Sequence, residues 1–178
     1  VIDEAYVDFG GESAAPLTRK YSNLIVTQTF SKSRSMAGAR LGFGIACPEL
    51  IRDMNTVKYS TNPYNVNAMT MAAGIGALLS EDYTRKNCQT VIENRAFCMD
   101  AMQKMGFEMT NSKTNFIFAK HPAIDGGTLY TKLRERGILV RHFNNPLIAQ
   151  YNRITVGTRE EMQALLNAIA DILEENKQ

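Results

Sequence analysis

Short apolar runs separated by turn residues occupy the first quarter of the chain. Residues 1–7 and 24–26 each predict a strand, and residues 16–21 predict a short helix between them. Two strands joined by a helical crossover are typical of a right-handed parallel βαβ unit. A polar loop over residues 29–38 follows, and residues 41–46 predict a further strand.

Three helices are predicted in the middle of the chain, over residues 48–59, 65–79 and 81–105. Pro48 suits the first position of a helix, and Asn62-Pro63 separates the first helix from the second. The third helix has a stripe at helical spacing: Cys88, Ile92, Arg95, Met99 and Met102. We expect this stripe to pack in a core, although methionines can also form a binding surface.

The last part of the chain alternates strands and helices. Residues 107–109, 115–119, 138–141 and 153–156 predict strands. Asp125 can cap a helix that ends at Gly137, and Thr158 with Glu161 forms a capping box before a final helix. That helix has one apolar face: Met162, Leu165, Leu166, Ile169 and Leu173. The order predicts an α+β region with its helices on one side of a small sheet.

The predicted fold is therefore α/β overall, in two parts. We place the boundary within the long third helix, so that residues 1–89 form one domain and residues 90–178 a smaller α+β domain. Because Val1 opens directly into an apolar strand, we expect the chain to be a fragment of a longer protein whose neighbouring strands lie upstream.

Composition excludes several classes of protein. The 178 residues are 44% hydrophobic and 21% charged, and 20 basic against 18 acidic residues give a net charge of +2. This balance gives no reason to expect nucleic acid or a membrane as partner, and no apolar run approaches membrane-spanning length. Three widely spaced cysteines match neither a disulfide framework nor a metal site, so we expect a cytoplasmic protein without bound metal.

Two groups of polar residues follow predicted strands in the first part. Asp3 and Glu4 stand where open α/β sheets bind ligands, although a carboxylate there can also serve as a loop cap. Lys32 follows the next strand, flanked by serines and followed by arginines and glycines. Hydroxyl groups, guanidinium groups and backbone amides are what a phosphate group needs. This is not a P-loop, because the lysine precedes the glycines.

Four segments together resemble one known family. TFSK at residues 29–32 with MAGARLG at 36–42 resembles the lysine segment of class I/II, fold-type I pyridoxal-phosphate (PLP) aminotransferases, and VIDEAY at 1–6 lies where that family has its upstream aspartate. NPYNVN at 62–67 and RITVGT at 153–158 resemble the histidinol-phosphate branch. The resemblance covers essentially the whole chain and implies the C-terminal portion of such an enzyme: a remnant of its PLP-binding large domain, followed by its small domain.

The resemblance implies a role for each candidate residue in the first domain. Lys32 would bind the PLP cofactor covalently and later carry the proton between the substrate and the cofactor. Asp3 would keep the pyridine nitrogen protonated, and Tyr6 would donate a hydrogen bond to the phenolic oxygen. Ser31 and Arg40 would hold the phosphate group, for which the planar guanidinium is well suited.

Two arginines of the second domain are candidates for substrate binding. By the same resemblance, Arg153 would bind a substrate carboxylate, and Arg141 would bind a second acidic group, a phosphate or the side-chain carboxylate of glutamate. Arg141 could equally be a surface residue. His142 could line the same pocket, or be an ordinary surface or core histidine.

Three functional hypotheses stay open at this point. The first is an aminotransferase that acts on histidinol phosphate and 2-oxoglutarate in histidine biosynthesis, working as a homodimer on small molecules. The second is another PLP enzyme of the same fold, such as an aromatic-amino-acid aminotransferase or threonine-phosphate decarboxylase. The third is a non-catalytic α/β module in which Lys32 and the arginines are structural.

Overall fold

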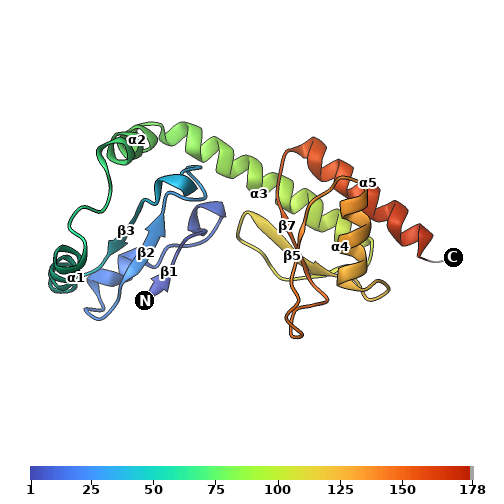
Figure 1. The fold of residues 1–178 in the computed structure, drawn as a ribbon, viewed down its shortest axis with the longest axis horizontal. Helices are drawn as coiled ribbons and strands as arrows, with labels where there is room; N and C mark the ends of the chain where they lie inside the picture. Colours follow the sequence, from blue (N-terminus) through green and yellow to red (C-terminus); the bar gives the residue numbers. More distant parts are fainter. Residues whose placement is uncertain (177–178) are drawn as a thin grey trace. The chain divides into compact units, whose positions relative to one another are not determined.

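A computed structural model describes residues 1–176 of the chain (Figure 1). It divides into two compact units, Val1–Cys88 and Gln89–Gln178. The division falls within the long helix α3 (Glu81–Lys104), whose first residues belong to the first unit and whose remainder belongs to the second.

The first unit contains a three-stranded sheet in the order β1-β2-β3. The parallel pairing expected for the first two strands is confirmed, since β1 (Ile2–Asp3) runs parallel to β2 (Val26–Thr29). β3 (Gly42–Ile45) pairs with β2 in the antiparallel sense, so the sheet is mixed. The carboxyl ends of β1 and β2 therefore lie at the same edge of the sheet.

The first two strands differ in extent from the prediction. The chain turns at Glu4, whose carbonyl accepts a hydrogen bond from the Val7 amide, and a short 3-10 helix η1 (Val7–Phe9) follows. The Leu24 amide donates to the Tyr21 carbonyl in another turn, so pairing of β2 begins two residues later than predicted. Apolar residues favour a strand, but only residues that face a partner strand form one.

The helices of the first unit lie close to where the sequence predicts them. A 3-10 helix η2 (Ala15–Arg19) joins β1 to β2, and another, η3 (Ala37–Ala39), precedes β3. α1 (Pro48–Thr61) begins at its proline. α2 (Ala68–Leu79) begins after Asn67, whose side-chain oxygen accepts the Thr70 amide.

Glu4 is buried directly after β1, with 8% of its surface exposed. Its carboxylate accepts hydrogen bonds from the Ser13 hydroxyl at 2.7 Å, the Ala14 amide at 2.5 Å and the Gln28 amide group at 2.8 Å. Burial acts to raise the pKa of Glu4, but these three hydrogen bonds outweigh it and hold the pKa below its ordinary value. The carboxylate thus ties the end of β1 to β2 and to the loop before η2.

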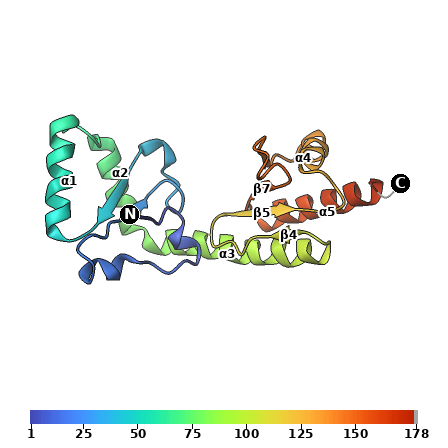
Figure 2. The ribbon, with the colours of Figure 1, turned by 90° about the horizontal axis from the view of Figure 1, so that it is seen from below.

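The second unit is built on a four-stranded antiparallel sheet in the order β4-β5-β7-β6. Its strands are β4 (Glu108–Met109), β5 (Phe116–Lys120), β6 (Arg141–His142) and β7 (Asn152–Thr155). Its helices are the remainder of α3, α4 (Gly126–Glu135) and α5 (Arg159–Glu175). Figure 2 shows α5 running alongside the second half of α3.

Only one face of this sheet is buried. Ile117 and Ala119 of β5 and Ile154 of β7 are at most 3% exposed, and they form one core with residues of all three helices. Successive strand residues point to opposite faces, so Phe116, Phe118 and Arg153 lie on the other face. This pattern agrees with the expected layer of helices on one side of the sheet. The helix residues of the core are Cys98, Met102, Leu129, Leu133, Met162, Leu165, Leu166, Ala168, Ile169 and Ile172.

The predicted starts of α4 and α5 are confirmed, whereas α4 ends at Glu135, two residues before the predicted end at Gly137. The Asp125 carboxylate accepts the Thr128 amide at the start of α4, and Thr158 and Glu161 form the capping box of α5. Gly106, with φ of 92°, follows α3. The strand predicted over residues 138–141 begins only at Arg141, because the Ile138 amide instead closes the end of α4 on the carbonyl of Leu133.

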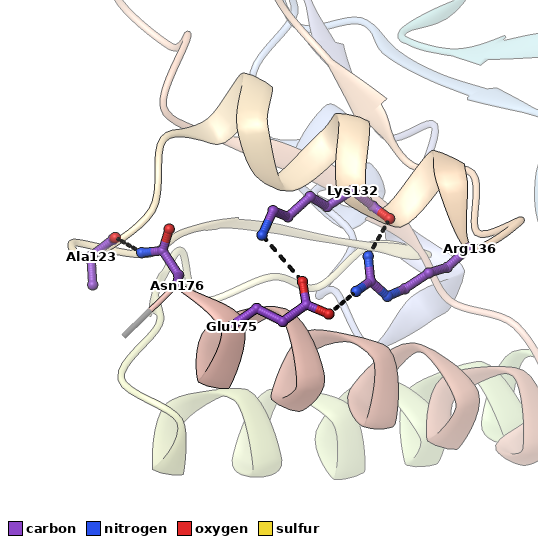
Figure 3. A network of polar contacts seen from close by, with 5 residues as sticks. All are labelled: Ala123, Lys132, Arg136, Glu175 and Asn176. Atoms are coloured by element: carbon purple, nitrogen blue, oxygen red, sulfur yellow. Dashed lines mark hydrogen bonds and ion pairs between the residues drawn. The ribbon is translucent and has the colours of Figure 1, made fainter. Parts of the chain in front are cut away.

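An ion-pair network joins α4 to α5 (Figure 3). Lys132 and Arg136 both contact the carboxylate of Glu175, and their hydrogen bonds hold the pKa of Glu175 below its ordinary value. The Asn176 side chain donates to the carbonyl of Ala123. These contacts fix the end of α5 against α4 at the surface of the unit.

No helix within residues 1–176 is long and apolar enough to cross a membrane. The same residues contain no cluster of histidine, cysteine, aspartate and glutamate that could hold a metal ion. Cys47, Cys88 and Cys98 are free thiols.

We expect the Glu4→Gln variant to unfold more easily by about 1–3 kcal/mol, because the new amide would point a donor at the Gln28 donor inside a buried site. The pKa of Glu4 is lowered in the folded state, so its contribution is present above the unfolded pKa and is lost as pH falls through the folded pKa. Urea unfolding at several pH values measures both effects. Glu12→Gln, at an exposed position, is the control. Equal free energies of unfolding for the two variants would contradict the role of Glu4.

Candidate functional site

Lys32 lies exposed in the loop that follows β2. Its Nζ atom is 5.9 Å from the centre of the Tyr6 ring, which belongs to the segment after β1. The two segments meet because β1 and β2 are parallel neighbours, so the chain leaves both strands at the same edge. The structure therefore brings together Lys32 and Tyr6, two residues that are 26 positions apart.

Asp3 is the last residue of β1 and pairs with Thr27 of β2. Its carboxylate is exposed, and its Oδ1 atom accepts the Ala5 amide at 3.0 Å. The neighbouring Glu4 is buried and fully occupied by structural hydrogen bonds. Of the two adjacent carboxylates, Asp3 is the one that is open to a ligand.

The hydrogen bonds between β2 and β3 place Ser31 near Arg40. Thr29 pairs with Gly42, and the Phe30 amide donates to the Leu41 carbonyl, so the next residues on each side meet at the same end of the ladder. The Ser31 hydroxyl is 2.9 Å from the Thr29 hydroxyl.

Arg40 has a backbone conformation that is uncommon for a residue with a side chain. Its φ angle is +54°, in the left-handed region, and the residue is exposed. One guanidinium nitrogen donates to the Ala37 carbonyl at 3.0 Å. Its other N–H groups make no ion pair within residues 1–176, and the same holds for Lys32. An exposed guanidinium without an ion pair suits a phosphate group.

Arg34 has a structural role instead. Its guanidinium donates to the Ala77 carbonyl at 3.0 Å, and it forms an ion pair of 2.9 Å with Glu81. Its side chain is 15% exposed. Arg34 thus anchors the Lys32 loop to α2 and the start of α3, which distinguishes it from the exposed Arg40.

In the second unit, Arg141 and Arg153 are directly opposite each other on the neighbouring strands β6 and β7. Residues paired in this way lie on the same face of a sheet, with Cβ atoms about 4.5–5.5 Å apart. The Arg141 guanidinium lies over the Phe143 ring at 5.2 Å, and that of Arg153 lies over Phe116 at 5.4 Å. Neither arginine has an ion-pair partner among the described residues.

Both arginines line an open cavity of about 520 Å³, which lies around the edge strand β6. His142 and Tyr130 line the same cavity, and their rings stack at 5.8 Å. The structure therefore supports the pocket position for His142. Sequence reasoning missed Tyr130, because nothing in the spacing of α4 indicates that this residue meets β6. Two adjacent positive charges with no carboxylate between them repel each other and lower the stability of the fold, unless an anion binds between them.

Comparison with known proteins identifies the family to which this chain belongs. Residues 1–169 match the family model "Aminotransferase class I and II". The histidinol-phosphate aminotransferase of Pseudomonas putida is 46% identical over 170 residues, which are 96% of this chain and 49% of that protein.

Solved structures agree on the fold. The crystal structure of the histidinol-phosphate aminotransferase from Clostridium acetobutylicum matches with a TM-score of 0.88 and 25% identity, over 98% of this chain and 54% of that one. The Sinorhizobium meliloti histidinol-phosphate aminotransferase, solved in complex with pyridoxal-5'-phosphate, matches with a TM-score of 0.81 at 24% identity, over 97% of this chain and 48% of that one. The chain thus spans about half the length of the relatives it matches.

We expect inorganic phosphate to stabilise the second unit, because it would neutralise the facing guanidinium groups of Arg141 and Arg153. With phosphate at ten times its Kd, the free energy of unfolding rises by about 1.4 kcal/mol, a change that thermal unfolding detects. Arg141→Gln should remove most of this gain while costing at most about 0.5 kcal/mol without phosphate, since it also removes a repulsion.

The control for this experiment is Arg134→Gln, an exposed arginine near the end of α4. It should respond to phosphate as the unchanged chain does, at ionic strength matched with sodium chloride. If both variants lose the stabilisation by phosphate equally, the anion does not bind at the arginine pair, that is, Arg141 and Arg153.

Proposed function

Because the chain belongs to the class I and II aminotransferase family, we propose that it carries the cofactor-binding lysine of a PLP-dependent aminotransferase. The whole enzyme would exchange an amino group between histidinol phosphate and 2-oxoglutarate in histidine biosynthesis. The observation that carries the proposal is the pairing of β1 with β2, which sets the open carboxylate of Asp3 and the amine of Lys32 at one edge of a sheet. The names of relatives such as the Pseudomonas putida protein support the choice of substrate.

The residues at this edge fit PLP. An exposed lysine without an ion pair can bind an aldehyde carbon, and the Ser31 hydroxyl with the Arg40 guanidinium suits its phosphate group. Asp3 is the open carboxylate that a pyridinium nitrogen requires, and Tyr6 lies against Lys32. When bound, PLP supplies an electron sink for the negative charge that develops at the substrate α-carbon.

The protein groups would then bind, orient and move protons. The Lys32 amine would take the proton from the substrate α-carbon as a general base. It would then donate that proton to the C4′ carbon of the cofactor as a general acid. The Asp3 carboxylate would hold a proton on the ring nitrogen. With 2-oxoglutarate, Arg153 would bind one carboxylate and Arg141 the other. Histidinol phosphate has no carboxylate, and its phosphate group would bind between the two guanidinium groups.

We further propose that the first unit is part of the PLP-binding large domain and that the second is the small domain. The enzyme would act in the cytoplasm as a homodimer. One feature supports a partner or further chain over the first unit: its helices α1 and α2 expose many large apolar side chains, which are usually covered in a stable protein. The exposed residues are Met54, Val57, Tyr59, Met69, Met71, Ile75, Leu78 and Leu79.

We expect the full-length protein to bind PLP with a visible absorption band, and borohydride to fix the cofactor on Lys32. Peptide mapping after reduction measures the labelled position. Lys32→Ala should abolish labelling, whereas Lys20→Ala, at an exposed lysine outside the site, should leave it unchanged. Equal labelling of the Lys32→Ala protein would remove the enzyme hypothesis.

We expect the 178-residue chain alone to have little or no transaminase activity, because it spans about half of the relatives it matches and the family site also uses groups outside that half. A coupled assay with histidinol phosphate and 2-oxoglutarate tests this, with the full-length protein as the positive control. Turnover by the short chain at a similar rate would show that the described residues suffice.

A further inference from the structure

Asn152 is a polar side chain in the core-facing layer of the small sheet. It is 1% exposed and lies on β7 in the same layer as Ile117, Ala119 and Ile154. A buried amide is unfavourable unless its hydrogen bonds are satisfied. Its position directly before Arg153 suggests a function connected with the arginine pair.

The amide of Asn152 has a defined orientation. Its Nδ2 atom donates to the Gly126 carbonyl at 2.8 Å, and a carbonyl can only accept, so the Oδ1 atom must face the other way. Oδ1 is 3.3 Å from the Nδ1 atom of His142. Because Oδ1 can only accept, a hydrogen bond in this contact requires a proton on Nδ1 of His142.

The His142 ring is confined on its other sides. The Tyr130 ring stacks against it, and a Cβ atom at Gly127 would lie 3.5 Å from its Nε2 atom. Both Tyr130 and Gly127 belong to α4. The start of α4 and the buried asparagine together hold the imidazole in one place.

This contact affects the register of β6. That strand has only two residues and lies at the edge of the sheet, where it pairs with β7 alone. So short a ladder specifies its register weakly. A slip by one residue would turn Arg141 toward the core and His142 toward the open face, since strand side chains alternate. Only the register that pairs His142 with Asn152 satisfies the buried amide, and that register also pairs Arg141 with Arg153.

We propose that Asn152 and His142 form a positioning pair that holds Arg141 opposite Arg153 and so sets the spacing of the two guanidinium groups for a doubly charged anion such as a phosphate monoester. The inference rests on the proposed role of this arginine pair in substrate binding. Asn152 and His142 act through the arginines and do no chemistry themselves.

The test uses the full-length enzyme and two variants, Asn152→Leu and His142→Phe. Each removes one side of the contact while keeping a side chain of similar size. We expect each to raise the KM for histidinol phosphate and the Ki of inorganic phosphate about tenfold or more, with kcat within about twofold. The double variant should be little worse than either single one, because both lose the same contact.

Ile154→Val is the matched control for a purely structural effect. It lies on the same strand and the same face and is equally part of the core, yet it makes no side-chain hydrogen bond. It should lower the Tm without changing KM or Ki. Equal changes of KM in the control, or unchanged KM in both variants, would overturn the positioning role.

Nitrogen NMR of the unmodified enzyme gives a second measurement that needs no variant. His142 should be the Nδ1–H tautomer, and the Nε2–H tautomer would contradict the proposed contact. The two proposals fail differently: an enzyme that neither binds PLP nor turns over histidinol phosphate ends the proposed function. An active enzyme with an intact arginine pair and unaffected variants ends only this inference.

Discussion

Strand side chains alternate between two faces, and burial of one face decides where the candidate functional groups of this chain can be. In the small sheet, Ile117 and Ile154 pack into the core, so Arg153 between its buried neighbours must face outward. The same constraint acts at the end of β1, where Glu4 is buried and bound by three donors while Asp3 remains open. The core thus selects which of two adjacent polar residues is available for a ligand.

The available basic groups share a second property, which is the lack of a carboxylate partner. Arg34 and Arg136 form ion pairs and serve the fold, whereas Arg40, Arg141 and Arg153 form none within residues 1–176. Two facing guanidinium groups reduce stability in the absence of a ligand, and contact with Phe116 and Phe143 offsets part of that cost. An unfavourable arrangement of this kind is expected where binding of an anion is the function.

Much of the local structure was predictable because local interactions determine it. The Asp125 cap, the Thr158–Glu161 capping box and the proline at the start of α1 involve residues a few positions apart. Strand ends were less predictable. Leu24 and Ile138 are as apolar as strand residues, but the Leu24 amide closes a turn and the Ile138 amide closes the end of α4, so both residues lie outside the strands. The parallel pairing of β1 with β2 followed from the helical connection between them.

The sequence by itself determined the family, through four ordered motifs, and it named Lys32, Asp3, Arg40 and Arg153 as candidates. Their roles stay predictions. Tertiary structure alone decided which side chains share a surface: that Lys32 lies against Tyr6, that Arg34 is structural, and that Tyr130 and His142 line the cavity of the arginine pair. The physical reason is that motifs record residue types and spacing along one chain. Contacts between β6, β7 and α4 depend on register and packing, which one-dimensional spacing does not contain.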